Sequence, residues 1–256
     1  MGRGKLRGLI ALLAWLGLQP ALAGDGATIM LDPGHTPRQQ GALGVRGVYE
    51  VVYNDHFAAK LADALRAASF TVRLTREPGQ SLSLTDRATI ANDEQPALFL
   101  AIHHDSAQLA YLKKIELASG AAYQTTRPIG GYSIFVSKAN PAFPDAYRFA
   151  EQLGQALLGL GRPPTPHHAE DIAGERREWL NERLGIYRFD DLVVLHKTRV
   201  PAVLLEVGVI VDPDDERYVS QAHNQDAMCQ AIVDAVRAYL GQGHAAASPP
   251  ADAARP

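Results

Sequence analysis

Short apolar runs alternate with longer segments of helical periodicity along most of this 256-residue chain. Residues 97–102 and 202–207 are apolar at nearly every position, as expected for strands whose sheet is covered on both faces. Phe57, Leu61 and Leu65 recur every four residues, which is typical of an amphipathic helix. This alternation predicts an α/β fold: a single domain with a mainly parallel twisted sheet of about six strands and helices on both faces.

The individual elements follow from the same patterns and from their flanking residues. Ser83 and Asp86 match a capping box, which predicts a short helix ending near Asn92. The segment 106–130 is less regular and is interpreted as an insertion or long loop. The predicted strands are 27–31, 70–75, 97–102, 132–137, 192–195 and 202–207, and the other predicted helices start near Asn54 and span 145–160 and 224–240.

The first 23 residues have the composition of a secretory signal peptide. A basic segment precedes the apolar run 9–18, which is too short to span a bilayer, and Ala21-Leu22-Ala23 is a small-residue cleavage site. This predicts a periplasmic or secreted protein without a transmembrane span in the mature chain. A single folded domain is predicted over 27–241, and 242–256, rich in Ala, Pro and Ser, is predicted to be a disordered tail.

The charge and the cysteine content exclude several function classes. A formal net charge of −3 argues against a nucleic-acid-binding protein, which usually carries a basic surface. Cys229 is the single cysteine of the sequence, so neither an intramolecular disulfide nor a thiolate zinc finger can form.

Residues with metal-binding side chains lie where ligand sites of α/β sheets usually form, beyond the carboxyl ends of strands. His35 follows the first predicted strand, His103 follows the third, and Glu50 lies just before the first helix. Two imidazoles and one carboxylate are a common catalytic zinc set that leaves a fourth position for water. Glu206, at the end of the last strand, could then act as a general base.

Several sequence motifs resemble the zinc-dependent N-acetylmuramoyl-L-alanine amidases of the Amidase_3 type, in the order and approximate spacing of that family. The resemblance extends over residues 27–240. The motifs are Leu31-Asp32-Pro33-Gly34-His35, Gly47-x-x-Glu50 with Asn54, Leu74-Thr75-Arg76, Leu84-x-x-Arg87-x-x-x-Ala91-Asn92, Ile102-His103-x-Asp105, and Pro201-Ala202-x-Leu204-x-Glu206-x-Gly208.

The resemblance implies specific roles for four of these residues. His35, Glu50 and His103 would bind one Zn²⁺ ion, and Glu206 would be the catalytic carboxylate. The implied activity is hydrolysis of the amide between N-acetylmuramic acid and L-alanine of the peptidoglycan stem peptide. In some relatives an insertion near the site holds an inhibitory helix that an activator protein displaces, and residues 111–116 are a candidate for such a cover.

Other polar residues near these motifs have weaker predictions. Asp32, His104 and His196 are candidates for supporting a ligand or contacting the substrate. Because neighbouring strand residues face opposite ways, only one of His103 and His104 is expected to reach the metal. Arg76, Arg87 and Asn92 are interpreted as structural, and His167 and His168, in a proline-rich loop, as solvated.

Three alternative functions stay open at the level of sequence. An exported zinc carboxypeptidase that trims stem peptides could use the same ligands, and its products would distinguish it. A non-catalytic wall-binding protein with an amidase-like fold would not need Glu206. A solute-binding α/β protein fits the composition but has no use for the histidines and glutamates at the strand ends.

Overall fold

The computed structural model describes residues 26–246, with side chains described as far as residue 241. The predicted signal peptide, 1–23, and residues 247–256 of the predicted tail lie outside the described residues. Helix α6 (Ala222–Ala246) continues past the predicted domain end at residue 241. Within the described part of the chain, no helix combines the length and the apolar character needed to cross a membrane.

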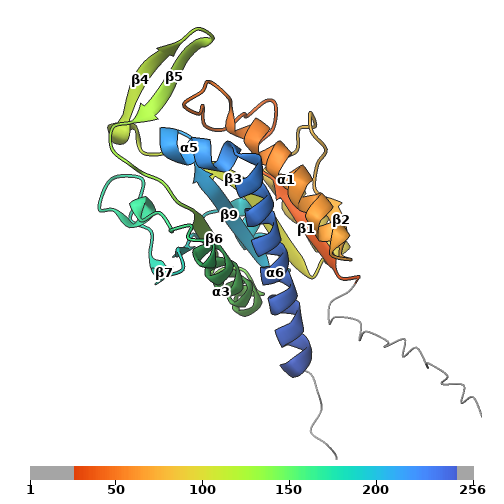
Figure 1. Cartoon of the computed structure of the whole chain (residues 1–256). Coiled ribbons are helices and arrows are strands. Elements are labelled where there is room, and N and C mark those ends of the chain that lie inside the picture. Colours follow the sequence, from red (N-terminus) through yellow and green to blue (C-terminus); the bar gives the residue numbers. More distant parts are fainter. Residues whose placement is uncertain (1–25, 247–256) are drawn as a thin grey trace, which may run out of the picture.

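A seven-stranded sheet forms the centre of the described domain (Figure 1). Its strand order is β2-β1-β3-β9-β6-β8-β7, and the first four strands are parallel to one another. Strand β6 runs antiparallel to β9, and β7 antiparallel to β8, so the sheet is mixed. The strands are β1 (Thr28–Pro33), β2 (Thr71–Leu74), β3 (Leu98–Asp105), β6 (Ser133–Val136), β7 (Trp179–Asn181), β8 (Ile186–Arg188) and β9 (Ala202–Val209).

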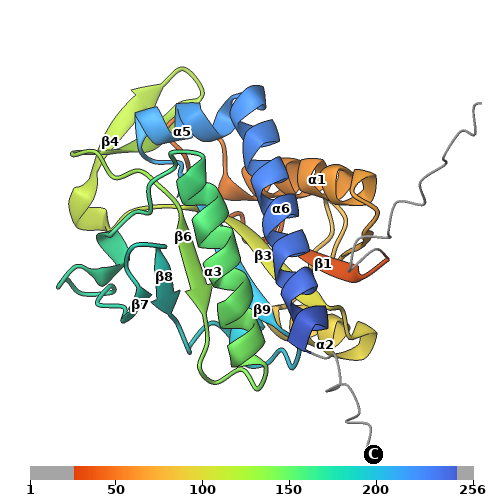
Figure 2. The same ribbon diagram turned by 60° about the horizontal axis from the view of Figure 1, so that its bottom comes forward.

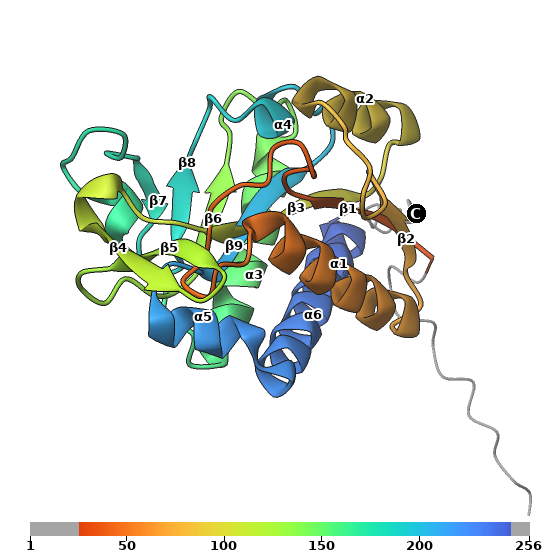
Figure 3. The ribbon, with the colours of Figure 1, turned by 90° about the horizontal axis from the view of Figure 1, so that it is seen from above.

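Helices cover both faces of this sheet, which confirms the predicted α/β class. Helices α1 (Glu50–Ala67), α3 (Phe143–Gly159) and α6 pack on one face, where α3 and α6 lie side by side (Figure 2). Helices α2 (Leu84–Glu94) and α4 (Val193–His196) lie on the other face (Figure 3). The central strands are apolar along most of their length because each face has a hydrophobic cluster of its own.

Alternating residues of the central strands contribute to the two clusters. On β3, Leu98, Leu100 and Ile102 belong to the cluster under α1, α3 and α6, while Phe99 and Ala101 belong to the opposite cluster. The same alternation continues into the polar end of the strand. His103 therefore shares the face of Phe99 and Ala101, and His104 shares the face of α1.

The helix start predicted from a capping box is confirmed. The hydroxyl of Ser83 accepts a hydrogen bond from the backbone N–H of Asp86 at 3.1 Å, and α2 begins at Leu84. Helix α1 begins at Glu50, four residues before the predicted start at Asn54. Its first residue, Glu50, lies beside the last residues of β3, where it contacts His103 and His104.

One prediction about secondary structure is wrong. Residues 192–195 do not form a strand, because Val193–His196 is the short helix α4. A four-residue apolar run fits one buried helical turn as well as a strand, so periodicity could not distinguish the two. Of the two interpretations of segment 106–130, the long loop is excluded, since β4 (Leu112–Leu117) and β5 (Gly120–Thr125) pair there as an antiparallel hairpin.

The remaining short elements complete the chain order. The 3₁₀ turn η1 (Leu109–Tyr111) precedes the hairpin, and η2 (His167–Ala169) follows α3. Helix α5 (Pro213–Ser220) begins after Asp212, whose carboxylate accepts hydrogen bonds from the backbone of Asp214 and Asp215. The hairpin projects from the domain beside α5 (Figure 1).

Candidate active site

The turn after β1 is held by two buried arginines. Arg76 donates to the carbonyl of Pro33 at 3.1 Å and to that of Gly34 at 3.0 Å. Arg87 donates to the carbonyls of Pro33 at 2.7 Å and His35 at 2.6 Å. His35 has a backbone φ of 63°, an unfavourable conformation for a residue with a side chain. These contacts confirm the structural interpretation of both arginines and fix the direction of the His35 side chain.

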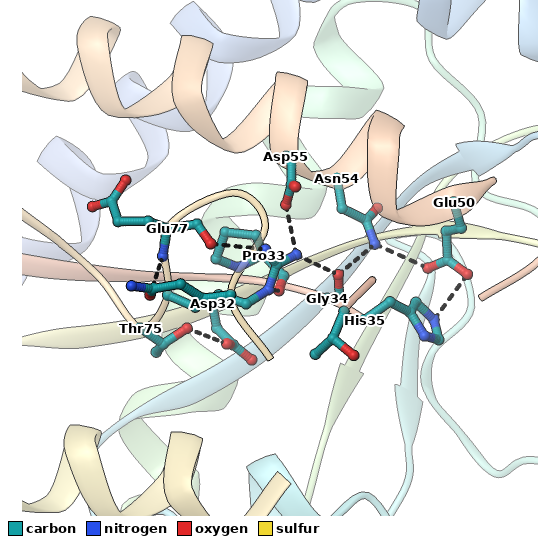
Figure 4. Close-up of polar contacts among 12 residues, drawn as sticks. Asp32, Pro33, Gly34, His35, Glu50, Asn54, Asp55, Thr75 and Glu77 are labelled. Carbon is teal, nitrogen blue, oxygen red and sulfur yellow. Dashed lines mark hydrogen bonds and ion pairs between the residues drawn. The ribbon is translucent and has the colours of Figure 1, made fainter. Parts of the chain in front are cut away.

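Three side chains from separate elements converge next to this turn. Nε2 of His35 lies 2.9 Å from Oε2 of Glu50, and Nδ1 of His103 lies 2.9 Å from Oε1 of Glu50. Ligand-capable atoms of the three residues all lie within 4.8 Å of one another. Figure 4 shows His35 and Glu50 pointing toward each other from the turn and from the start of α1.

The Glu50 carboxylate is fixed by further hydrogen bonds. Oε1 accepts from Nδ2 of Asn54 at 3.2 Å (Figure 4). Oε1 also accepts from the backbone N–H of His104 at 3.3 Å, and Oε2 accepts from the N–H of Ala42 at 3.1 Å. Although burial raises the pKa of Glu50, the hydrogen bonds from His103 and His35 outweigh it and hold the pKa below its ordinary value. Glu50 is therefore an ionised carboxylate at neutral pH.

Two glycines leave room for this cluster. A Cβ atom at Gly34 would lie 2.3 Å from Nε2 of His103, and one at Gly41 would lie 2.4 Å from Oε2 of Glu50. Gly41 also has a φ of +76°, which favours glycine. Neither position can carry a side chain while the imidazoles and the carboxylate keep these places.

Glu206 lies on β9, directly opposite His103 in the parallel pairing with β3. Its Oε2 atom is buried and has no hydrogen-bond partner among the residues that the structure describes. Burial raises the pKa of Glu206 well above its ordinary value, and the charges of Asp105 and Glu50 raise it further. A carboxyl group with a raised pKa and an unused oxygen is suited to exchanging a proton with a substrate or with water.

His104 points away from the cluster, as the strand alternation predicts. Its side chain is buried, Nδ1 lies 2.8 Å from Oδ1 of Asn54, and its ring packs near those of Tyr53 and Phe57. Burial lowers the pKa of His104 to about 3, so the ring is neutral. Its side chain is therefore linked to Glu50 through Asn54, whose amide bonds both.

The other two weaker candidates do not contact the ligand atoms directly. Asp32 is buried and accepts hydrogen bonds from Arg87 at 2.6 Å and from the hydroxyl of Thr75, so it acts on His35 only through Arg87. His196 is the last residue of α4, and within residues 26–246 no hydrogen bond or ion pair joins it to the cluster. Asn92 bonds the backbone of Lys197 and Arg199, which confirms its structural role.

A cavity of about 170 Å³ opens beside the cluster. His35 and His103 line one wall, and the rest of its lining includes a set of aliphatic side chains from the α2 region, α4 and β9. These are Leu82, Leu84, Leu192, Val193, Val194 and Leu204. The cavity thus offers an apolar surface next to the two imidazoles.

The cluster fits a metal ion of the zinc type. It offers two imidazole nitrogens and one ionised carboxylate oxygen. This donor set suits Zn²⁺ better than harder ions such as Mg²⁺ or Ca²⁺, which prefer oxygen ligands. The carboxylate is already oriented by Asn54 and by two backbone N–H groups, as is usual for metal-ligating carboxylates.

Comparison with known proteins places the fold and these motifs in one family. The family model described as N-acetylmuramoyl-L-alanine amidase, Amidase_3, matches residues 29–238. The chain belongs to this family. A relative, "Probable cell wall amidase LytH" of Staphylococcus saprophyticus, is 30% identical over 217 residues. That match covers 84% of this chain, which spans 59% of the length of the relative.

Solved structures of family members have the same fold as this amidase-family chain. The N-acetylmuramyl-L-alanine amidase Ami1 of Mycobacterium smegmatis superposes with a TM-score of 0.66 at 20% identity, covering 86% of this chain and 99% of Ami1. The CwlD amidase of Clostridioides difficile, solved in complex with the GerS lipoprotein, gives a TM-score of 0.63 at 20% identity. It covers 85% of this chain and 100% of CwlD.

Two histidines of this amidase-family chain lie where sequence reasoning did not place them. His167 and His168 were expected to be solvated, but both are buried, at 2% and 8% exposure, and both contact Asp105. Their proline-rich loop gives no local signal for burial, because the partner carboxylate lies about 60 positions earlier in the sequence. A Pro-rich composition indicates a loop but not what the loop covers.

Proposed function

We propose that this chain is a zinc-dependent N-acetylmuramoyl-L-alanine amidase that hydrolyses the amide between N-acetylmuramic acid and L-alanine of the peptidoglycan stem peptide. One observation carries the proposal: His35, Glu50 and His103 converge within metal-binding distance, and Glu206 occupies the paired position beside His103. The family match supports the amide of the muramoyl group as the bond that is cut.

His35, Glu50 and His103 would hold the zinc ion. When bound, zinc supplies a Lewis acid that polarises the scissile carbonyl and makes water more acidic. Glu206 takes the proton from the attacking water as the new C–O bond forms. It then gives that proton to the nitrogen of L-alanine as the C–N bond breaks, so the products are a free amine and the carboxylic acid of the lactyl group, which releases the second proton of the water to solvent.

The surroundings of Glu206 suit both halves of this proton transfer. Its pKa is raised by burial and by neighbouring carboxylates, which brings it nearer to the working pH of a general base. Its buried Oε2 atom has no hydrogen-bond partner within residues 26–246, so it could bond water or the leaving nitrogen. The aliphatic side of the adjacent cavity can receive the methyl groups of the lactyl and alanyl units.

The proposed setting is the periplasm or the cell wall. The N-terminal composition of the chain supports export. The name of the Staphylococcus relative, a cell wall amidase, agrees with that setting.

An activator protein is a further proposed partner, since the CwlD amidase was solved in complex with the GerS lipoprotein. Residues 111–116, the candidate for an inhibitory cover, lie mostly in strand β4. An inhibitory helix is therefore not proposed there.

The test is hydrolysis of purified peptidoglycan followed by detection of free N-terminal alanine. We expect Glu206→Gln to retain zinc and to lose turnover by about 10²- to 10⁴-fold, because proton transfer is lost while the ligands stay. His103→Ala should lose both zinc and activity. Glu94→Gln and His223→Ala, which change exposed residues, serve as matched controls and should behave as wild type.

The products also separate the alternative functions. Release of D-alanine or of other C-terminal residues without free N-terminal L-alanine would indicate a carboxypeptidase. Binding of wall fragments without any cleavage would indicate a non-catalytic wall-binding protein. Activity that persists after complete removal of zinc by a chelator would contradict the proposed mechanism.

A further inference from the structure

A second group of metal-capable side chains lies near the first, and neither the mechanism nor the family motifs use its histidines. Nε2 of His168 lies 2.7 Å from Oδ2 of Asp105, and Nε2 of His167 lies 3.2 Å from the same oxygen. Ligand-capable atoms of the three residues all lie within 4.8 Å of one another. We propose that Asp105, His167 and His168 form a second zinc site, distinct from the His35 cluster.

Both imidazoles are oriented by hydrogen bonds at their other nitrogen. Nδ1 of His168 lies 2.9 Å from Oε2 of Glu175, and Nδ1 of His167 lies 2.8 Å from the hydroxyl of Thr165. In metal sites, a ligating histidine usually donates its second N–H to a carboxylate or another oxygen, which turns the lone pair of the first nitrogen toward the metal. The arrangement here directs both Nε2 atoms at Asp105.

One nitrogen of the group lacks a hydrogen bond. Nε2 of His167 belongs to a side chain that is only 2% exposed, and within the described residues it forms no hydrogen bond and has only its 3.2 Å ion-pair contact with Asp105. A hydrogen-bonded His168–Asp105 pair alone would leave this nitrogen unsatisfied, which is unfavourable in a buried position. A cation shared by the three residues would satisfy it.

The two imidazole rings lie close together, with their centroids 3.9 Å apart, and both Nε2 atoms lie beside the same carboxylate oxygen of Asp105. One divalent cation coordinates both neutral rings and the carboxylate at once. This arrangement needs only the Nδ1 protons that Glu175 and Thr165 can accept.

The surrounding structure holds the donors in place. Asp105 is the last residue of β3, and the two histidines begin the 3₁₀ turn η2. The ring of His168 packs against Phe135, at a centroid distance of 4.9 Å, and against Tyr187 at 5.5 Å. The side chain of Gln108 donates to Glu175 at 2.7 Å, which fixes the carboxylate behind His168.

The donor set identifies the class of metal. Two imidazole nitrogens and one carboxylate oxygen suit Zn²⁺, whereas Mg²⁺ and Ca²⁺ need more oxygen ligands. The site would tie the loop of η2 to the end of β3, two residues beyond His103. Its predicted role is to fix that loop beside the proposed catalytic centre.

The experiment measures zinc stoichiometry in the purified full chain, with Zn²⁺ alone as the probe and native mass spectrometry with elemental analysis as the readout. We expect two zinc ions per wild-type chain. His35→Ala should retain one ion, His167→Ala should retain one, and the double variant none. His56→Ala, at an exposed position, should retain two. One ion in the wild type, lost in His35→Ala and unaffected by His167→Ala, would overturn the proposal.

Two further measurements keep the test valid if His167→Ala fails to fold. Thr165→Val removes only the oxygen that orients His167. It should lower the affinity of one of the two zinc sites about 10- to 100-fold. Wild-type crystals soaked in Zn²⁺ should give an anomalous peak between Asp105 and the two imidazoles, and its absence at saturating Zn²⁺ would contradict the site. Since both measurements report zinc rather than turnover, they are independent of whether the chain is an amidase.

Discussion

Replacing Arg87 by methionine tests how the candidate active site is supported. Arg87 is 2% exposed and makes three short hydrogen bonds, to Oδ1 of Asp32 at 2.6 Å and to the carbonyls of Pro33 at 2.7 Å and His35 at 2.6 Å. Methionine fills much of the same space without the charge. The substitution therefore leaves Asp32, which is 1% exposed, as a buried carboxylate supported mainly by Thr75.

The expected cost follows from the burial of both partners. Breaking a buried ion pair by removing one partner costs about 3–5 kcal/mol of unfolding free energy. That is a large share of the roughly 5–15 kcal/mol that stabilises a typical domain. Because Arg87 also holds the carbonyl of His35, zinc affinity of the His35 cluster should fall about 10- to 100-fold.

Urea unfolding followed by circular dichroism measures the loss of stability, and competition with a chromophoric chelator measures zinc affinity. The control is Arg66→Met, because the Arg66–Asp63 pair is exposed and should change stability by less than about 1 kcal/mol. The double variant Asp32→Asn with Arg87→Met should lose less than the sum of the single changes, since no unpaired charge remains. A loss below about 1 kcal/mol for Arg87→Met would refute the reasoning.

Four further predictions concern packing, chemical reactivity, the pH dependence of stability, and capping. Gly154→Ala should destabilise the protein by about 1–3 kcal/mol, because the new Cβ would lie 2.7 Å from the carbonyl oxygen of Leu184. The control is Gly159→Ala in the same helix, where a new Cβ meets no described atom within 4 Å. In thermal melts this control should be neutral or stabilising. Burial raises the pKa of the Cys229 thiol to about 12, so iodoacetamide at pH 9 should label it slowly in the folded protein and rapidly in urea; equal rates would contradict its burial. The same raised pKa means that the neutral Cys229 thiol contributes to the unfolding free energy fully below about pH 8.5 and loses this contribution as the pH rises toward 12. A Cys229→Ala variant should lack this pH-dependent loss. Ser83→Ala should cost about 1 kcal/mol in urea unfolding, since the N–H of Asp86 loses its acceptor, and no change would rule out a capping role.

Much of the architecture could be predicted from periodicity because it depends on local pattern. The strand containing Leu98 and the helix containing Phe57 each carry a repeat that identifies the element and its buried face. The positions of β6, β8 and β7 beyond β9 in the sheet, and the antiparallel direction of β6, depend on which sheet edge these segments pair with. No local sequence pattern encodes that choice. The strand predicted over 192–195 failed because a single helical turn is too short to show a period.

The candidate site was predictable to the extent that its residues follow strand ends. His35, Glu50 and His103 meet because β1 and β3 are parallel neighbours whose carboxyl ends share one edge with the start of α1. His167 and His168 were missed for the opposite reason. Their burial depends on a loop that folds back onto Asp105, and such long-range contacts leave no trace in the local sequence.

The pairing of β3 with β9 has a consequence for how this fold can change. His103 and Glu206 occupy paired positions on adjacent strands. The spacing between neighbouring strands, about 4.8 Å, therefore sets the separation of their backbones. Surface connections such as the β4–β5 hairpin can lengthen, shorten or be exchanged without altering that distance. Such a scaffold can acquire new ligands through its periphery while His103 and Glu206 stay in register.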